Sequence, residues 1–187
     1  MLCTRRCIIN VGRKGESYDN KRYRIRSGQC SVDCCQRNRD CFLHSDVHCL
    51  VNSHLSPSEM RAHPDVLLVR WHVYATAKKW EMAVEVARAI TKLLPENSFG
   101  WVHWAFSLHE LKRTKEAWGV LVPVVDKFPD EYIIRYNLAC YACQLGNLKE
   151  AWQWLEKAFD FGDSKNLKLM ALDDHDLEPL WTDISEI

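Results

Sequence analysis

The stretch Asn137–Ala158, NLACYACQLGNLKEAWQWLEKA, decides the fold of this chain. Apolar residues recur at helical spacing on each side of Gly146, so each half carries one apolar stripe. Glycine suits the left-handed residue that ends a helix, and the stretch therefore predicts two helices joined by a turn. Neither helix can bury its stripe alone, so further helices of the same kind must stack on this pair.

Weaker copies of this pattern lie upstream at a constant separation. Ala83, Ala117 and Ala151 are each 34 residues apart, and Pro95 and Pro129 have the same separation. Self-similarity at this period is typical of stacked helix–turn–helix units. The chain is therefore predicted to be all-α, an α-solenoid of helix–turn–helix repeats with a C-terminal capping segment.

The spacing resembles the tetratricopeptide repeat, a helix–turn–helix unit of the same period. The small residue at the eighth position of that repeat is met by Ala105 and Ala139, whereas Trp71 stands there in the first repeat. The glycine between the helices is kept in the third repeat only, with Lys78 and Lys112 in the other two. The cap stretch LKLMALDDHDLEPLW resembles that of a group of bacterial repeat proteins with no assigned chemistry. The resemblance implies three repeats and a cap, at about 64–97, 98–131, 132–163 and 164–187.

Within this frame the helices can be placed, together with the residues that begin or interrupt them. Pro123 falls inside the second helix of the second repeat and should kink or shorten it. Asn97 and Asp130 precede predicted helices and are expected to cap them. The six predicted helices are 65–77, 81–93, 99–111, 115–127, 133–145 and 149–159.

Residues 1–54 form a basic, cysteine-rich segment that lacks the repeat pattern. Residues 1–50 hold ten Lys/Arg and five Asp/Glu, whereas residues 51–187 hold fifteen and twenty, so the two parts carry about +5 and −5. This contrast does not suit one uniform domain. We therefore divide the chain into residues 1–54, expected to be disordered or to follow from a misassigned start codon, and a repeat domain at 55–187.

A zinc site is the alternative interpretation of the N-terminal segment. Cys30, Cys34, His44 and His48 could supply four ligands, because thiolate and imidazole groups at short spacings can close a tetrahedron around zinc. The chain would then be a zinc-dependent regulatory or nucleic-acid-binding protein. The gap of nine residues between the two pairs is shorter than the usual one of about twelve, however. We therefore expect no cofactor, no metal and no nucleic-acid partner.

Enzyme chemistry and membrane insertion both lack a sequence signal. No nucleophile–base constellation or phosphate-binding glycine loop occurs, so the protein is not expected to be an enzyme. The CxxC at Cys140 and Cys143 lies in mid-helix, where small packed side chains are expected, and the acidic run at Asp173–Asp176 is expected to cap a helix. The chain lacks an apolar run long enough for a membrane span or a signal peptide, and a cytoplasmic protein with reduced cysteines is expected.

The first helices of the repeats are the expected functional surface. In the repeat family they line a concave groove, and members that clamp a carboxylate there use Lys and Asn at positions that are apolar or aromatic here. This wall suits an amphipathic helix or an extended apolar peptide of an unknown protein partner. A missing N-terminal repeat, or a second copy of the chain in a homo-oligomer, could cover part of it instead. The expected groove residues are Leu68, His72, Phe99, Val102, Phe106, His109, Tyr136 and Cys140.

Overall fold

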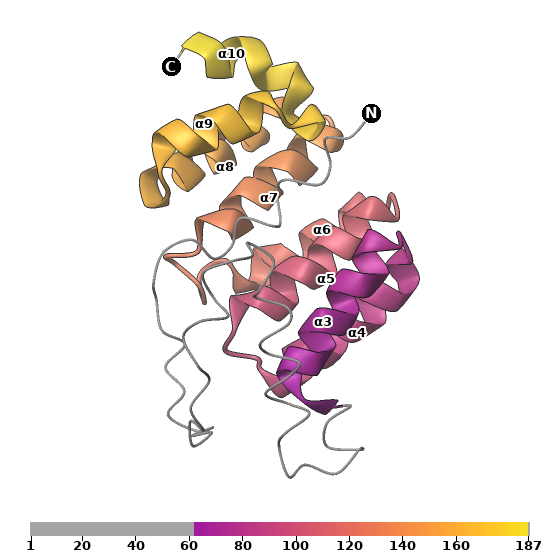
Figure 1. Cartoon of the computed structure of the whole chain (residues 1–187). Coiled ribbons are helices and arrows are strands. Elements are labelled where there is room, and N and C mark those ends of the chain that lie inside the picture. The colour runs from indigo at the N-terminus through magenta and orange to yellow at the C-terminus, as the bar shows by residue number, and fades with distance from the viewer. Residues whose placement is uncertain (1–61, 187) are drawn as a thin grey trace, which may run out of the picture.

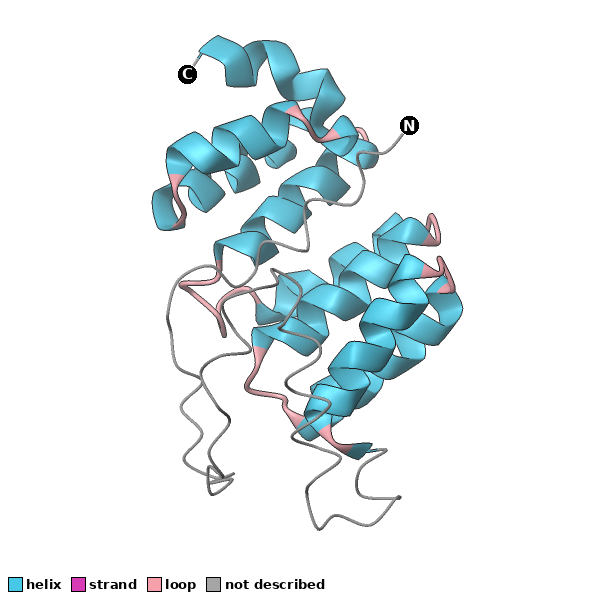
Figure 2. Cartoon of the chain, viewed as in Figure 1, coloured by secondary structure: helices cyan, strands magenta, loops and turns pink. Residues whose placement is uncertain are grey.

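The computed structural model describes residues 62–186 of the chain, and all its regular elements there are helical (Figure 2). The predictions for residues 1–54, including the four zinc ligands, lie outside the described residues. The α-helices are α3 (Pro64–Thr76), α4 (Trp80–Leu93), α5 (Ser98–Glu110), α6 (Thr114–Leu121), α7 (Tyr132–Gln144), α8 (Leu148–Phe161), α9 (Ser164–Leu172) and α10 (Trp181–Glu186). Two 3₁₀ helices are η2 (Val122–Val124) and η3 (His175–Leu180).

The helices stack in chain order as three hairpins followed by a terminal group. Helices α3 and α4, α5 and α6, and α7 and α8 pair within hairpins, and α4 also packs closely on α5. Figure 1 shows α3 to α6 gathered at one end of the molecule and α8 to α10 at the other, with α7 between them. This is the α-solenoid architecture that the period predicts, because each hairpin buries its apolar stripes on its neighbours. The domain division at residue 55 stays a prediction.

The three hairpin turns share one backbone conformation although their sequences differ. Lys78, Lys112 and Gly146 have φ values of 55°, 63° and 82°. In each turn the next residue donates its N–H to a carbonyl five positions back, for example from Asn147 to the Ala142 carbonyl at 2.9 Å. A side chain in the left-handed region costs roughly 1 kcal/mol, so the two lysines are held there by the hairpins around them.

The predicted helix signals have mixed outcomes. Pro123 shortens the second helix of the second repeat as predicted, since α6 ends at Leu121 and gives way to the 3₁₀ turn η2. Asn97 caps α5, where its side-chain oxygen accepts the N–H of Phe99 at 2.8 Å. The prediction for Asp130 is wrong, because Glu131 takes the N-cap position of α7 and makes no side-chain bond there.

The periodic alanines lie in the packed interior of the hairpins. Ala83, Ala117 and Ala151 are fully buried with no exposed surface. Each alanine lies on the second helix of its hairpin, in the same buried position. The same packing requirement therefore recurs every 34 residues in the sequence. The eighth-position residues Ala105 and Ala139 are also fully buried, whereas Trp71 fills the same position in α3 and is 2% exposed.

Two glycines on neighbouring helices should respond in opposite directions to the same substitution. A Cβ atom on Gly100 would lie 2.9 Å from the backbone nitrogen of Thr91, so Gly100→Ala is expected to push α5 away from α4 and destabilise the fold by about 1–3 kcal/mol. A Cβ atom on Gly119 would meet no atom within 4 Å, and Gly119→Ala should stabilise α6 by about 0.5–1 kcal/mol. Urea unfolding of both variants checks this pair, and equal shifts would contradict the close approach at Gly100.

Candidate functional site

The eight predicted groove residues fall into two groups in the structure. On α3 and α5, the side chains of Leu68, His72, Phe99 and Phe106 are partly exposed. The other four are buried, with exposed fractions of 2% for Val102, 5% for His109, 0% for Tyr136 and 4% for Cys140. The open part of the wall is therefore carried by the first two hairpins, and its contact with a partner stays a prediction.

Aromatic side chains of α3, α4 and α5 form a cluster that packs against the partly exposed part of the predicted groove. The Trp71 indole N–H donates to Ser107 Oγ at 3.0 Å, and its ring meets His103 edge-on with centroids 4.0 Å apart. Phe99 stacks on His103 at 3.5 Å between centroids. Phe106 packs edge-on against Trp80 at 5.6 Å. These contacts fix the two first helices against each other, so the partly exposed rings stand on a rigid base.

His103 is a neutral histidine held inside this cluster. Its Nδ1 lies 2.8 Å from the Phe99 carbonyl oxygen, which can only accept, so Nδ1 carries the proton. Its buried Nε2 has no hydrogen-bond partner among the described residues. Burial is the largest influence on its pKa, opposed by the Phe99 carbonyl and reinforced by His72, and lowers it to about 3.

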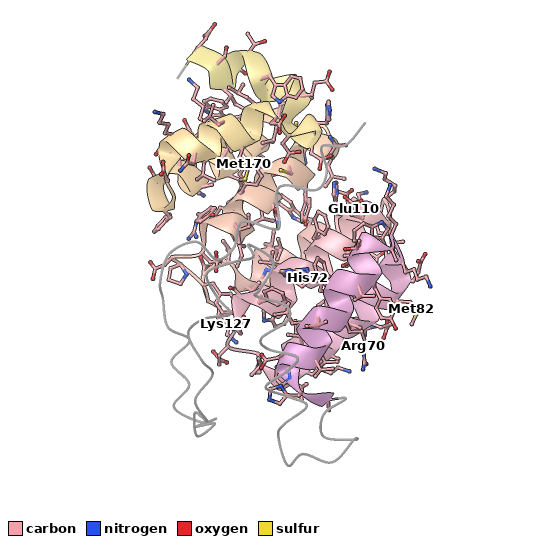
Figure 3. The ribbon with its side chains drawn as sticks, in the orientation of Figure 1. Arg70, His72, Met82, Glu110, Lys127 and Met170 are labelled. Carbon is pink, nitrogen blue, oxygen red and sulfur yellow. The ribbon has the colours of Figure 1, made fainter. Side chains whose placement is uncertain are left out.

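His72 lies at the rim of the same cluster, on α3 where it faces the middle of the molecule (Figure 3). Its ring meets the Trp71 ring edge-on at 5.2 Å between centroids. Burial lowers its pKa below the usual value for histidine. With His103 also neutral, the wall between α3 and α5 presents aromatic and apolar surface without a histidine charge at neutral pH.

The α7 part of the predicted groove is covered by the chain's own C-terminal segment. The Tyr136 hydroxyl donates to Asp174 Oδ2 at 3.0 Å, and the Cys140 thiol lies 3.6 Å from the same oxygen. The Gln144 side chain donates to the Asp176 carbonyl at 3.1 Å. At the end of α5, His109 Nε2 lies 2.9 Å from Asp176 Oδ2. The segment around η3 thus covers the α7 part of the predicted groove.

The CxxC pair lies in the packed interior, and the acidic run leads into η3. Cys140 and Cys143 are both free and buried. Burial, followed by the carboxylates of Asp176 and Asp174, raises the pKa of Cys143 to about 11, so its thiol stays protonated. Between residues 62 and 186 no three potential ligands come together around one point. Asp174 caps η3 as predicted by accepting the N–H of Asp176 at 3.1 Å.

Two features of the site escaped the sequence analysis. No pattern in the sequence around His103 marks it as buried, and only the packing of α3 on α5 shows this. The sequence predicts only a capping role for Asp174 and Asp176, because their contacts with Tyr136 and His109 join residues far apart in the chain. Among the described residues no helix is both long enough and apolar enough to cross a membrane.

Comparison with known proteins shows a similarity in fold. No family model matches the chain, and no curated protein matches its sequence. Among solved structures, MamA MSR-1 C2 is similar with a TM-score of 0.50 and 20% sequence identity, over 66% of this chain and 69% of that one. That protein has a helical repeat fold of the tetratricopeptide type. The described part of this chain is accordingly an all-helical repeat structure similar to those of the tetratricopeptide type.

Proposed function

We propose that the protein is an interaction scaffold that holds an amphipathic helix or an extended apolar peptide of a partner protein against α3 and α5. The observation that carries this proposal is the row of partly exposed apolar and aromatic side chains on two adjacent first helices, Leu68, His72 and Phe99. The aromatic cluster holds the rings of His72 and Phe99 in place, which lowers the entropy lost on binding.

The apolar and aromatic side chains that α3 and α5 expose favour an apolar ligand over a charged one. Leu68 and His72 stand at the positions where carboxylate-binding repeats place lysine and asparagine. A partner side chain that enters here would exchange water for aromatic surface, worth about 25 cal/mol for each Å² of apolar area removed from water.

Replacing Leu68 with glutamate tests the proposed surface. A carboxylate in the apolar wall would have to lose its water when the partner binds, so Leu68→Glu is expected to weaken partner binding at least tenfold, or about 1.4 kcal/mol. The measurement is quantitative affinity capture from the native host with the full chain as bait. Met82→Glu is the matched control, because Met82 lies on α4 with 48% of its surface exposed and points away from the wall (Figure 3).

Light scattering on the purified chain separates a partner from a second copy. If the wall binds a different protein, both variants should keep the mass of the wild-type chain in solution. A dimeric wild-type chain that becomes monomeric with Leu68→Glu would assign the wall to self-association instead. Equal capture of the same proteins by wild type and Leu68→Glu would remove the α3–α5 wall from consideration.

A further inference from the structure

The ends of α5 and α7 form a cluster of hydrogen-bond donors that all face the C-terminal segment. A carboxylate oxygen can only accept, so His109 Nε2 carries a proton toward Asp176, while its Nδ1 lies 3.1 Å from the Thr114 hydroxyl. The Tyr136 hydroxyl, the Cys140 thiol and the Gln144 amide add three more donors in the same direction. Four donors from two helices therefore meet acceptors that lie within three consecutive residues of one segment.

The segment adds an apolar anchor to these polar contacts. Leu177 has no exposed surface and Leu180 is 3% exposed, and both belong to the core that contains α7. The recognised pattern is thus a pair of aspartates two residues apart followed by leucine, as in Asp174, Asp176 and Leu177. Tyr136 and Cys140 bind the carboxylate of Asp174, and His109 binds that of Asp176.

The segment is short and is held mainly by its side chains. Its helical part, η3, is a 3₁₀ helix with Pro179 inside it, a form with poorer hydrogen-bond geometry than an α-helix. In Figure 1 the chain turns back after α9 before α10 begins, and η3 packs against α7 in that turn. A segment of this kind can leave its site without unfolding the hairpins, because few backbone bonds tie it to them.

The charges around the site are mixed. Burial is the main reason why the pKa of Glu110 is raised, and Asp176 raises it further. His109, Lys112 and Lys78 act in the opposite direction. Both lysines are exposed on the hairpin turns beside the ends of α3 and α5. The lysines favour an acidic segment at this end of the groove, and Glu110 opposes it.

We infer that this end of the groove is a binding site for acidic segments, and that residues Asp174–Leu180 are its built-in occupant. A partner with two carboxylates two residues apart and a following leucine displaces that occupant and takes over its donors. This inference rests on the proposed function for the idea that the groove receives a partner protein. It adds the chemical class of the partner segment and an intramolecular competitor for it.

A peptide with the chain's own sequence tests the site. The labelled probe is LDDHDLEPLW, residues 172–181, titrated against the full wild-type chain and against the full chain with Asp174→Ala and Asp176→Ala. The attached segment competes at an effective concentration on the order of millimolar. The probe should therefore bind the double variant at least tenfold more tightly than the wild type. Tyr136→Phe in the double variant, or Asp174→Asn with Asp176→Asn in the probe, should each weaken binding at least tenfold.

Equal binding of the probe to both chains, no binding to either, or equal binding of the acidic and amide probes would overturn the inference. Hydrogen exchange on the unmodified chain gives a second measurement that does not depend on the folding of a variant. The amides of η3 should exchange at least a hundredfold faster than those of α7, because the segment opens locally. Exchange of both at one common rate would show that the segment leaves only on global unfolding, against the inference. Neither result alters the test at Leu68, so the two proposals fail separately.

Discussion

Trp71→Ala is expected to destabilise the folded chain by about 3–5 kcal/mol, the range found when a large buried aromatic side chain is deleted. Trp71 is 2% exposed and occupies a position where the other repeats hold alanine. Its ring packs against His103 and its N–H donates to Ser107 Oγ, so the substitution leaves a cavity and removes the hydrogen bond between α3 and α5. The Ser107 hydroxyl keeps its bond to the His103 carbonyl. The first hairpin would lose this contact of α3 with α5, and the packing of α4 on α5 would still join it to the second.

Urea unfolding followed by circular dichroism measures this loss. Val73→Ala is the matched control, because Val73 lies two residues away on the same helix with 58% of its surface exposed. The control should change the free energy of unfolding by less than about 0.5 kcal/mol. A similar small change for Trp71→Ala would contradict the packing of α3 on α5 described above.

Acidification from pH 7 to pH 4 is expected to remove about 3 kcal/mol of stability through His103 alone. The pKa of His103 is lowered to about 3 in the folded chain, against 6.5 for an ordinary histidine. Between these two values the unfolded chain binds a proton at this residue and the folded chain does not. Above about pH 6.5 the titration of His103 therefore takes nothing from the free energy of unfolding. As the pH falls toward 3, this free energy decreases progressively.

The pH dependence is best isolated by comparing variants. His103→Leu removes the titrating group, so its free energy of unfolding should fall between pH 7 and pH 4 by about 3 kcal/mol less than that of the wild type. Val102→Ala is the control, since Val102 is equally buried on the same helix and does not titrate. It should lower stability by a similar amount at both pH values. An unchanged pH dependence for His103→Leu would show that the imidazole is already protonated, or solvated, in the folded chain.

The sequence determined the helical repeat architecture because that information is local and periodic. The alanines at 83, 117 and 151 recur where two helices must approach closely, and a larger residue at any of them would separate the pair. Pro123 shortened its helix as expected, since a missing N–H and a ring clash act within one turn. These effects depend on neighbours within a few residues, so a single sequence reveals them.

Tertiary packing decided which parts of the predicted groove are open. The eight residues were chosen by their position in the repeat, and that choice cannot register a segment that returns from far along the chain. The contact from Tyr136 to Asp174 spans 38 residues and that from His109 to Asp176 spans 67. Such pairings depend on the whole shape of the stack, and no periodic pattern encodes them.

The conformation of the hairpin turns and the burial of Trp71 also depend on tertiary packing, because the local sequence does not indicate them. Lys78 and Lys112 adopt the conformation that the sequence indicates only at Gly146, because the paired helices impose the turn and outweigh its local cost. Trp71 breaks the small-residue rule because α5 provides a hydroxyl and an imidazole that accommodate its ring. The sequence by itself determined the repeating helical hairpins, through short-range periodicity. Only the tertiary structure decided the neutral aromatic wall and the covered end of the groove, since both arise from contacts between distant residues.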